Sequence, residues 1–137
     1  MERVYTTSRL DKLGVRPGVR VAIIGVPDED LRQELRARTH DLTEDAPLAD
    51  TDIVILGADS QEELSRLEDL RSTIVPNGAI WVVSRKGKAA TLRDVDVIAA
   101  ARTVGLVDNK VASFSPTHTA LRLVIPVALR APVRRDP

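Results

Sequence analysis

Short runs of apolar, largely β-branched residues recur along this chain, and segments with helical spacing separate them. The runs read VRVAII at residues 19–24, DIVILG at 52–57 and AIWVV at 79–83. Runs of this length suit strands that are buried on both faces of a parallel sheet. Strands that alternate with helices predict an α/β fold with right-handed crossover connections. At 137 residues the chain has the length of one domain with a sizeable core.

The predicted helices follow recognisable start signals. Ser60-Gln-Glu-Glu and Thr91-Leu-Arg-Asp each have the spacing of a capping box, and acidic residues open the segment after the first strand. We therefore predict helices over residues 7–13, 28–38, 60–74 and 91–105. Pro76-Asn-Gly78 is predicted to be a turn before the third strand. The patternless stretch 39–51 has room for one short strand at most.

The end of the chain predicts a reversed strand. Residues 107–114 and 120–128 are strand candidates, and only the short segment 115–119 joins them. So short a connection favours an antiparallel hairpin, which places one antiparallel strand in an otherwise parallel sheet. We predict one domain over residues 1–130 and a flexible tail over 131–137, because no linker or repeat interrupts the chain.

Composition excludes several classes of protein. The chain has no cysteine and two histidines, which removes thiol chemistry and leaves no support for a metal site. No signal peptide and no membrane span are evident, so the expected location is the cytoplasm, away from membranes. Aromatic residues make up 2% of the chain, which argues against a nucleic-acid partner that stacks bases. Residues 1–69 carry 16 acidic and 9 basic side chains, whereas residues 70–137 carry 4 and 11. This asymmetry either marks a polar partner or reflects two solvated surfaces.

The order of these segments resembles the class I S-adenosylmethionine-dependent methyltransferases. VRPGVRVAIIG is similar to the first strand of that family, ADTDIVILG to its fourth, and STIVPNGAIWVV to the helix, turn and fifth strand. The closing hairpin is similar to the family's reversed last strand. The resemblance implies a single three-layer, Rossmann-like α/β domain. The stretch KGKAATLRDVDV…GLVDNKVASFS is also similar to an actinobacterial family of unknown function with this fold.

Two departures from the methyltransferase pattern concern the cofactor. The family follows its first strand with a glycine-rich turn, whereas this chain has Gly25-Val26-Pro27-Asp28-Glu29-Asp30. Without small residues the backbone cannot approach a ligand closely, and three acids repel a carboxylate or phosphate. Only 27 residues separate the first strand from DIVILG, so a shortened core is expected. We predict that S-adenosylmethionine does not bind and that no other cofactor is needed.

The candidate ligand site lies at the carboxyl edge of the strands, where ligands bind in such sheets. Two lysines precede a predicted helix start, where an anion is favoured, and the hairpin turn adds hydroxyl groups and an imidazole. We predict an anion site formed by Lys86, Gly87, Lys88, Thr91, Ser115, Thr117 and His118. Asp28 and Asp30 on the neighbouring loop oppose it. The alternative is that the lysine loop merely connects strand to helix.

No set of catalytic residues emerges from the sequence. His118 has the chemistry of a general base, but a lone histidine in a turn is more often a surface residue. We therefore expect a non-catalytic, methyltransferase-like scaffold with a regulatory or protein-interaction role. The alternatives are a binder of a small anionic or nucleotide-like metabolite and, least favoured, a true methyltransferase. The oligomeric state cannot be predicted.

Overall fold

The computed structural model describes residues 8–130, which form one α/β domain with a six-stranded sheet. The helices are α1 (Arg9–Lys12), α2 (Glu29–Arg38), α3 (Gln61–Leu64), α4 (Leu67–Arg71) and α5 (Asp94–Thr103), with short 3-10 turns η1 (Gly87–Ala89) and η2 (Val127–Leu129). The strands are β1 (Val21–Ile24), β2 (Leu42–Glu44), β3 (Thr51–Gly57), β4 (Ile74–Arg85), β5 (Val107–Ser113) and β6 (His118–Val124). The predicted tail at 131–137 lies outside the described residues.

The strand order is β2-β1-β3-β4-β6-β5. Strands β1 to β4 pair in parallel, whereas β6 pairs antiparallel with both β4 and β5. The predicted parallel sheet with one reversed strand is therefore confirmed. The stretch between β1 and β3 holds only α2 and the three-residue β2, so the shortened core is confirmed as well.

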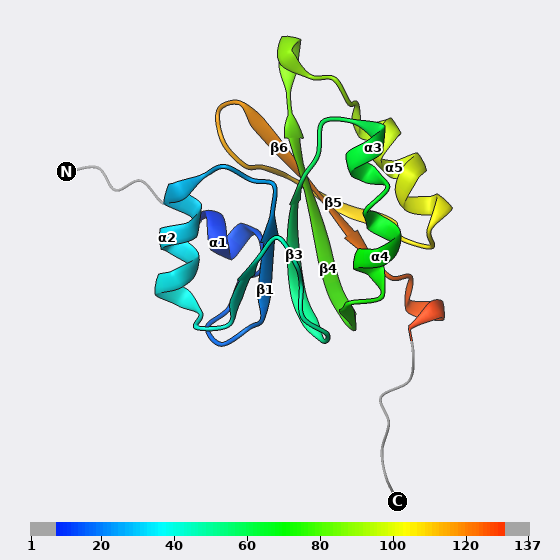
Figure 1. Ribbon diagram of the computed structural model, residues 1–137. Helices are drawn as coiled ribbons and strands as arrows, with labels where there is room; N and C mark the ends of the chain where they lie inside the picture. The colour runs from blue at the N-terminus through cyan, green and yellow to red at the C-terminus, as the bar shows by residue number, and fades with distance from the viewer. Residues whose placement is uncertain (1–7, 131–137) are drawn as a thin grey trace, which may run out of the picture.

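Helices cover both faces of the sheet, which gives three layers (Figure 1). Leucines of α3 and α4 pack with Val97 of α5 on one face, and leucines of α1 and α2 pack on the other. The two apolar clusters arise because successive strand residues point to opposite faces. Ile53 and Ile55 of β3, for example, belong to the cluster under α1 and α2, whereas Val54 belongs to the other.

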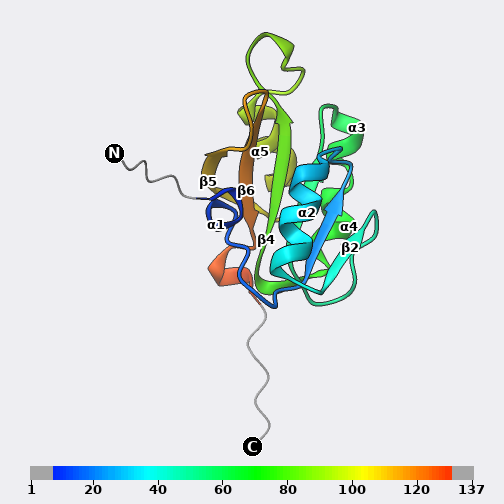
Figure 2. The same cartoon turned by 90° about the vertical axis from the view of Figure 1, so that its left-hand side faces the viewer.

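Trp81 is buried as expected, with 1% of its surface exposed. Its Nε1 donates a hydrogen bond to the carbonyl of Leu13 at 3.0 Å. This bond satisfies the indole N–H in the core and fixes the end of α1 over β4. Figure 2 shows α1 on the side of the sheet where β6 and β5 lie.

Several boundaries differ from those predicted. The predicted turn Pro76-Asn-Gly78 lies inside β4, where the β3–β4 register shifts between Thr51 and Ile53. Across this shift the β4 partners move from Ile74 to Ala79, so the turn-forming residues make a bulge instead of ending the strand.

Two predicted helices are also corrected. The helix predicted over 60–74 is split into α3 and α4, because a break at Ser65 and Arg66 separates them. The capping box predicted at Thr91 does not exist. Instead α5 begins after Arg93, whose N–H donates to the Asp96 carboxylate at 2.8 Å.

Candidate functional site

A cleft of about 540 Å³ opens at the carboxyl edge of the sheet. The chain leaves β1 toward β2 on one side and returns to β3 on the other, so this edge contains the switch point where ligands bind in α/β folds. The volume lies within the range of small-molecule sites. The cleft is lined by Gly25, Val26, Pro27, Asp28, Gly57, Asp59, Val83, Arg85, Phe114, Ser115, Pro116, Thr117 and His118.

The loop after β1 packs against the end of β3. Gly25 has a φ of +67°, a conformation that favours glycine, and Val26 is buried with 4% of its surface exposed. A Cβ added to Gly57 would lie 2.1 Å from the Gly25 carbonyl oxygen, so only glycine fits there. The backbone of this loop is therefore held down on β3 by contacts within the protein.

Asp28 forms the beginning of α2 and one wall of the cleft. Its carboxylate accepts a hydrogen bond from the Leu31 N–H at 2.9 Å, which caps the helix. Its second oxygen accepts a hydrogen bond from Arg9 at 2.9 Å. Burial acts to raise the pKa of Asp28, but the Leu31 and Arg9 contacts lower it more, so the net pKa lies below its usual value. Asp28 is therefore a fixed carboxylate at neutral pH.

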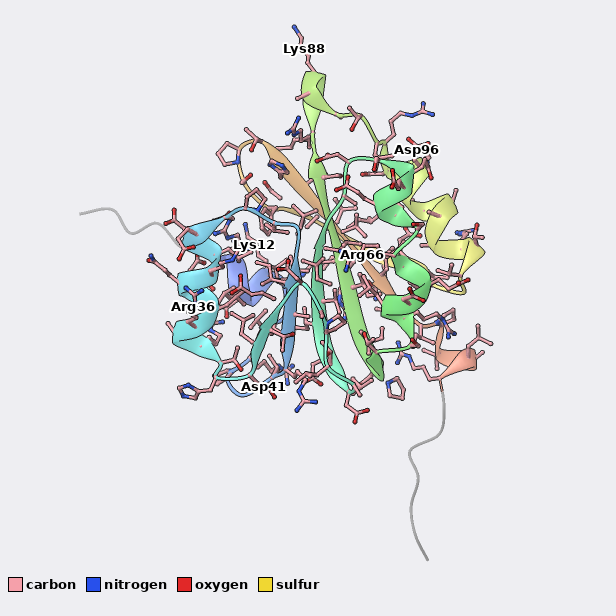
Figure 3. All side chains as sticks on the ribbon, in the orientation of Figure 1. Lys12, Arg36, Asp41, Arg66, Lys88 and Asp96 are labelled. Carbon is pink, nitrogen blue, oxygen red and sulfur yellow. The ribbon has the colours of Figure 1, made fainter. Side chains whose placement is uncertain are left out.

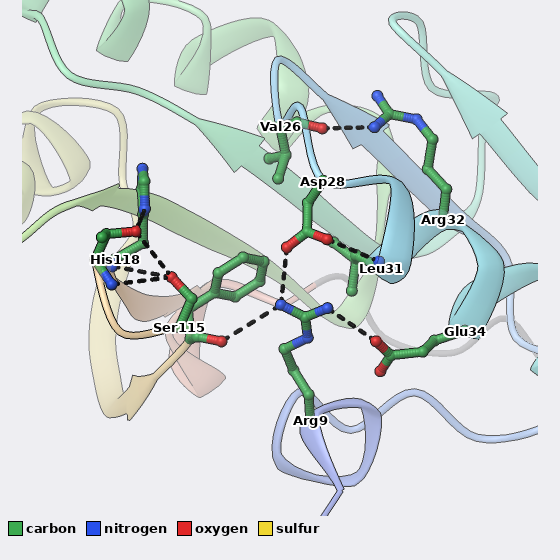
Figure 4. A network of polar contacts seen from close by, with 10 residues as sticks. Arg9, Val26, Asp28, Leu31, Arg32, Glu34, Ser115 and His118 are labelled. Carbon is green, nitrogen blue, oxygen red and sulfur yellow. Dashed lines mark hydrogen bonds and ion pairs between the residues drawn. The ribbon is translucent and has the colours of Figure 1, made fainter.

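Arg9 joins α1 to two walls of the cleft, as the network in Figure 4 shows. Its guanidinium donates to Asp28, to the carboxylate of Glu34 at 2.8 Å and to the Phe114 carbonyl at 3.5 Å. It also lies over the Phe114 ring, 4.8 Å from its centroid. Burial acts to lower the pKa of Arg9, but Asp28 and Glu34 outweigh it and raise the pKa above its usual value. Arg9 thus holds the β1–α2 loop and the hairpin turn together.

Asp59 and Arg85 provide a second charged pair on the cleft wall. Asp59 follows β3, and one of its carboxylate oxygens accepts the Arg85 N–H at 2.9 Å. The other oxygen lies 3.9 Å from Nε of Arg85, whose side chain is 58% exposed. Asp59 was not among the predicted site residues, although it lies two positions after the strand predicted at 52–57, a place that marks candidate site residues.

The hairpin turn supplies three of the predicted site residues. Ser115 Oγ accepts the N–H groups of Thr117 at 3.3 Å and His118 at 3.1 Å, which fixes the turn. Thr117 Oγ1 lies 2.8 Å from Nδ1 of His118. This contact orients the imidazole toward the cleft, whose lining includes Ser115, Thr117 and His118.

The other predicted site residues lie outside the cleft. The Lys86 N–H donates to the Thr117 carbonyl at 3.0 Å, so the lysine loop and the hairpin turn are neighbours, as predicted. The Lys86 ammonium points to Ser113 Oγ at 3.3 Å. Gly87 and Lys88 form η1, and Lys88 extends away from the domain (Figure 3). The hydroxyl of Thr91 donates to the carbonyl of Asp59. Because α5 begins only at Asp94, the expected helix start does not follow the lysines directly.

The site therefore combines an apolar lining with nearly balanced charge. Two carboxylates, Asp28 and Asp59, each face an arginine, and Asp30 is absent from the lining. Within residues 8–130, no group of three or more histidine or acidic side chains is placed to hold a metal ion. No helix in this range is both long and apolar enough to cross a membrane.

The fold is that of the class I S-adenosylmethionine-dependent methyltransferases. A candidate type 11 methyltransferase from Sulfolobus solfataricus superposes with a TM-score of 0.64 at 10% identity, covering 93% of this chain and 92% of that chain. A SAM-dependent methyltransferase from Aquifex aeolicus gives 0.59 at 13% identity, covering 85% and 87%. The N-methyltransferase NodS from Bradyrhizobium japonicum WM9, with bound S-adenosylhomocysteine, gives 0.60 at 9% identity, covering 83% and 81%. Such identities establish a shared fold alone.

Residues 10–127 match the family DUF3052, described as proteins of unknown function, and the chain belongs to this family. None of the curated proteins matches the sequence.

Proposed function

We propose that this chain is a non-catalytic, methyltransferase-like domain that binds a small polar molecule in the cleft and has a regulatory role. The observation that carries the proposal is the cleft itself, a space of about 540 Å³ at the switch-point edge of the sheet. Residues from four separate segments line it: the β1–α2 loop, the ends of β3 and β4, and the hairpin turn. Convergence of polar side chains on an apolar pocket is typical of ligand sites.

The chemistry of the lining favours a ligand of little net charge. Asp28 and Asp59 offer hydrogen-bond acceptors, Arg85 offers donors, and His118 offers either, depending on its tautomer. Buried or bulky apolar residues, including Val26 and Phe114, cover the remaining surface. A neutral or zwitterionic molecule with an apolar ring or chain would complement both the polar side chains and the apolar residues of the cleft.

Two features argue against methyl transfer. The loop after β1 has one glycine followed by Val26 and Pro27, so it lacks the small residues with which the glycine-rich turn of methyltransferases approaches a cofactor. In methyltransferases an acid at the end of the second strand holds the ribose, and Glu44 ends β2 in this chain. Here Glu44 is paired with Arg32 at 2.6 Å and Arg36 at 3.7 Å, and it does not belong to the cleft lining.

A matched pair of variants tests the proposal. Pro27→Trp places a bulky side chain at an exposed position of the cleft, whereas Pro17→Trp does the same in a turn outside it. The wild type is screened by thermal shift and ligand-observed NMR against nucleosides, nucleobases and amino acids. We expect at least one compound to stabilise the wild type and Pro17→Trp, and to bind Pro27→Trp about tenfold more weakly or not at all. If no compound binds the wild type, or if Pro27→Trp binds as tightly as Pro17→Trp, the cleft is not the ligand site.

A further inference from the structure

Among the basic side chains that lie away from the cleft and form no ion pair within residues 8–130, four lie on segments that contact one another. They are Lys12 at the end of α1, Lys110 on β5, Arg122 on β6 and Arg130 after η2. We call these four residues the basic strip. By contrast, all four arginines of α1 and α2 are paired with acids: Arg9, Arg32, Arg36 and Arg38. The basic strip therefore differs from the arginines of these two helices, whose charges are compensated.

Strand pairing places two of these side chains, those of Lys110 and Arg122, on one face. Arg122 is the cross-strand partner of Trp81 on β4 and of Lys110 on β5, so all three side chains point to the same side. The end of α1 covers this side, because Trp81 donates to the Leu13 carbonyl. Lys110 Nζ donates to the Lys12 carbonyl at 3.3 Å, which places Lys12 next to β5.

Arg122 is the member of the basic strip whose charge lies in the least favourable environment. It is half-buried, and burial lowers the pKa of its guanidinium, with a further lowering by the positive charge of Arg130. No described carboxylate acts on it in the opposite direction. Asp108 on β5 pairs with Leu123, whose side chain belongs to the other face, so it does not compensate Arg122. A partly desolvated charge without a partner is unfavourable, and an external anionic group would relieve this cost.

We propose that the basic strip binds an acidic, extended segment of a partner protein. Charge complementarity supports an acidic occupant. Strand β5 is the last strand of the sheet order, so its outer edge offers backbone groups to an added strand. Nucleic acid is disfavoured, because Trp81 and Phe114 are buried and provide no stacking platform.

The test uses the full chain and a fluorescein-labelled poly-glutamate peptide, with binding measured by fluorescence anisotropy at low salt. The strip variant is Lys110→Glu/Arg130→Glu. The control is Lys88→Glu/Arg102→Glu, which makes the same change of net charge at exposed positions outside the strip. We expect the strip variant to bind about tenfold more weakly or worse, because two attractions become repulsions. The control should bind like the wild type, and circular dichroism should show both variants folded.

Three results would overturn the proposal. One is that the wild type does not bind the peptide. Another is equal weakening by the control, which would mean a general effect of net charge. The last is a preference for another occupant through the same residues. Tighter binding of a DNA duplex, or self-association that the strip variant abolishes in sedimentation experiments, would show this. Because none of these measurements involves the cleft, the outcome is independent of the proposed small-molecule site.

Discussion

The contact between Arg9 and Asp28 should stabilise the whole cleft, and Arg9→Ala tests this. Both side chains are mostly shielded, with 18% and 25% of their surfaces exposed. Hydrogen bonds to charged groups contribute about 1.5–3 kcal/mol. The more exposed Glu34 pair adds about 0–1 kcal/mol, and the contact with Phe114 adds about 0.5–1 kcal/mol. We therefore expect Arg9→Ala to lower the free energy of unfolding by about 3 kcal/mol.

Urea denaturation followed by circular dichroism measures this loss. The control is Arg36→Ala, whose side chain is 52% exposed and whose ion-pair partners, Glu29 and Glu44, are exposed as well. This control should lose less than about 1 kcal/mol. Asp28→Asn preserves a good helix cap, so a double-mutant cycle with Arg9→Ala isolates the charge contact. A coupling energy below about 0.5 kcal/mol, or a loss no larger than that of Arg36→Ala, would refute the reasoning.

The same contact has a predictable dependence on pH. Because folding lowers the pKa of Asp28, its contribution is present above the unfolded pKa of about 3.9 and is lost as pH falls through the folded value. The difference in stability between the wild type and Arg9→Ala should therefore be constant near neutral pH and shrink in acid. A difference that grows on acidification would contradict the assigned sign.

Three further predictions concern the cofactor, the lysine loop and the core. Calorimetry with near-millimolar S-adenosylmethionine should show no heat of binding, and a micromolar dissociation constant would contradict this. Lys86→Ala/Lys88→Ala should weaken any binding of inorganic phosphate seen by phosphorus NMR, with Lys88→Ala alone having little effect; equal binding would make the loop a connector. Trp81→Phe should cost about 1–3 kcal/mol in urea, because the Leu13 carbonyl loses its donor and a small cavity remains. An unchanged midpoint would mean that this bond is not needed.

The sheet was largely predictable because its signals are local. The parallel strands β1, β3 and β4 contain continuous apolar runs, and the short connection at 115–119 left an antiparallel hairpin as the simplest solution. The bulge in β4 was not predictable, because proline and glycine favour turns and bulges alike. The start of α5 at Asp94 was also not predicted. Its capping box pairs Arg93 with Asp96, and arginine is not a usual first residue of this motif.

The candidate site was predictable only as a set of loops. Topology brings the ends of the strands together, and this places Asp28 near the hairpin turn without any knowledge of side chains. The role of Arg9 depends on contacts with residues 19, 25 and 105 positions away, which no sequence pattern records. The directions of the Lys86 and Lys88 side chains were not predictable, because loop membership does not fix side-chain direction. Lys88 is exposed at the tip of η1.

Likeness to methyltransferases does not identify a ligand for this domain, because the loop after β1, where Gly25 lies close to Gly57, differs from the loop of that family. In that family a glycine-rich turn lets the backbone approach the cofactor, whereas here both glycines are used to bring two strand ends into contact. In the cleft, side chains such as those of Asp59 and His118 form part of the polar surface. If the cleft binds the proposed ligand, its selectivity should therefore depend on these side chains, which likeness to methyltransferases does not specify.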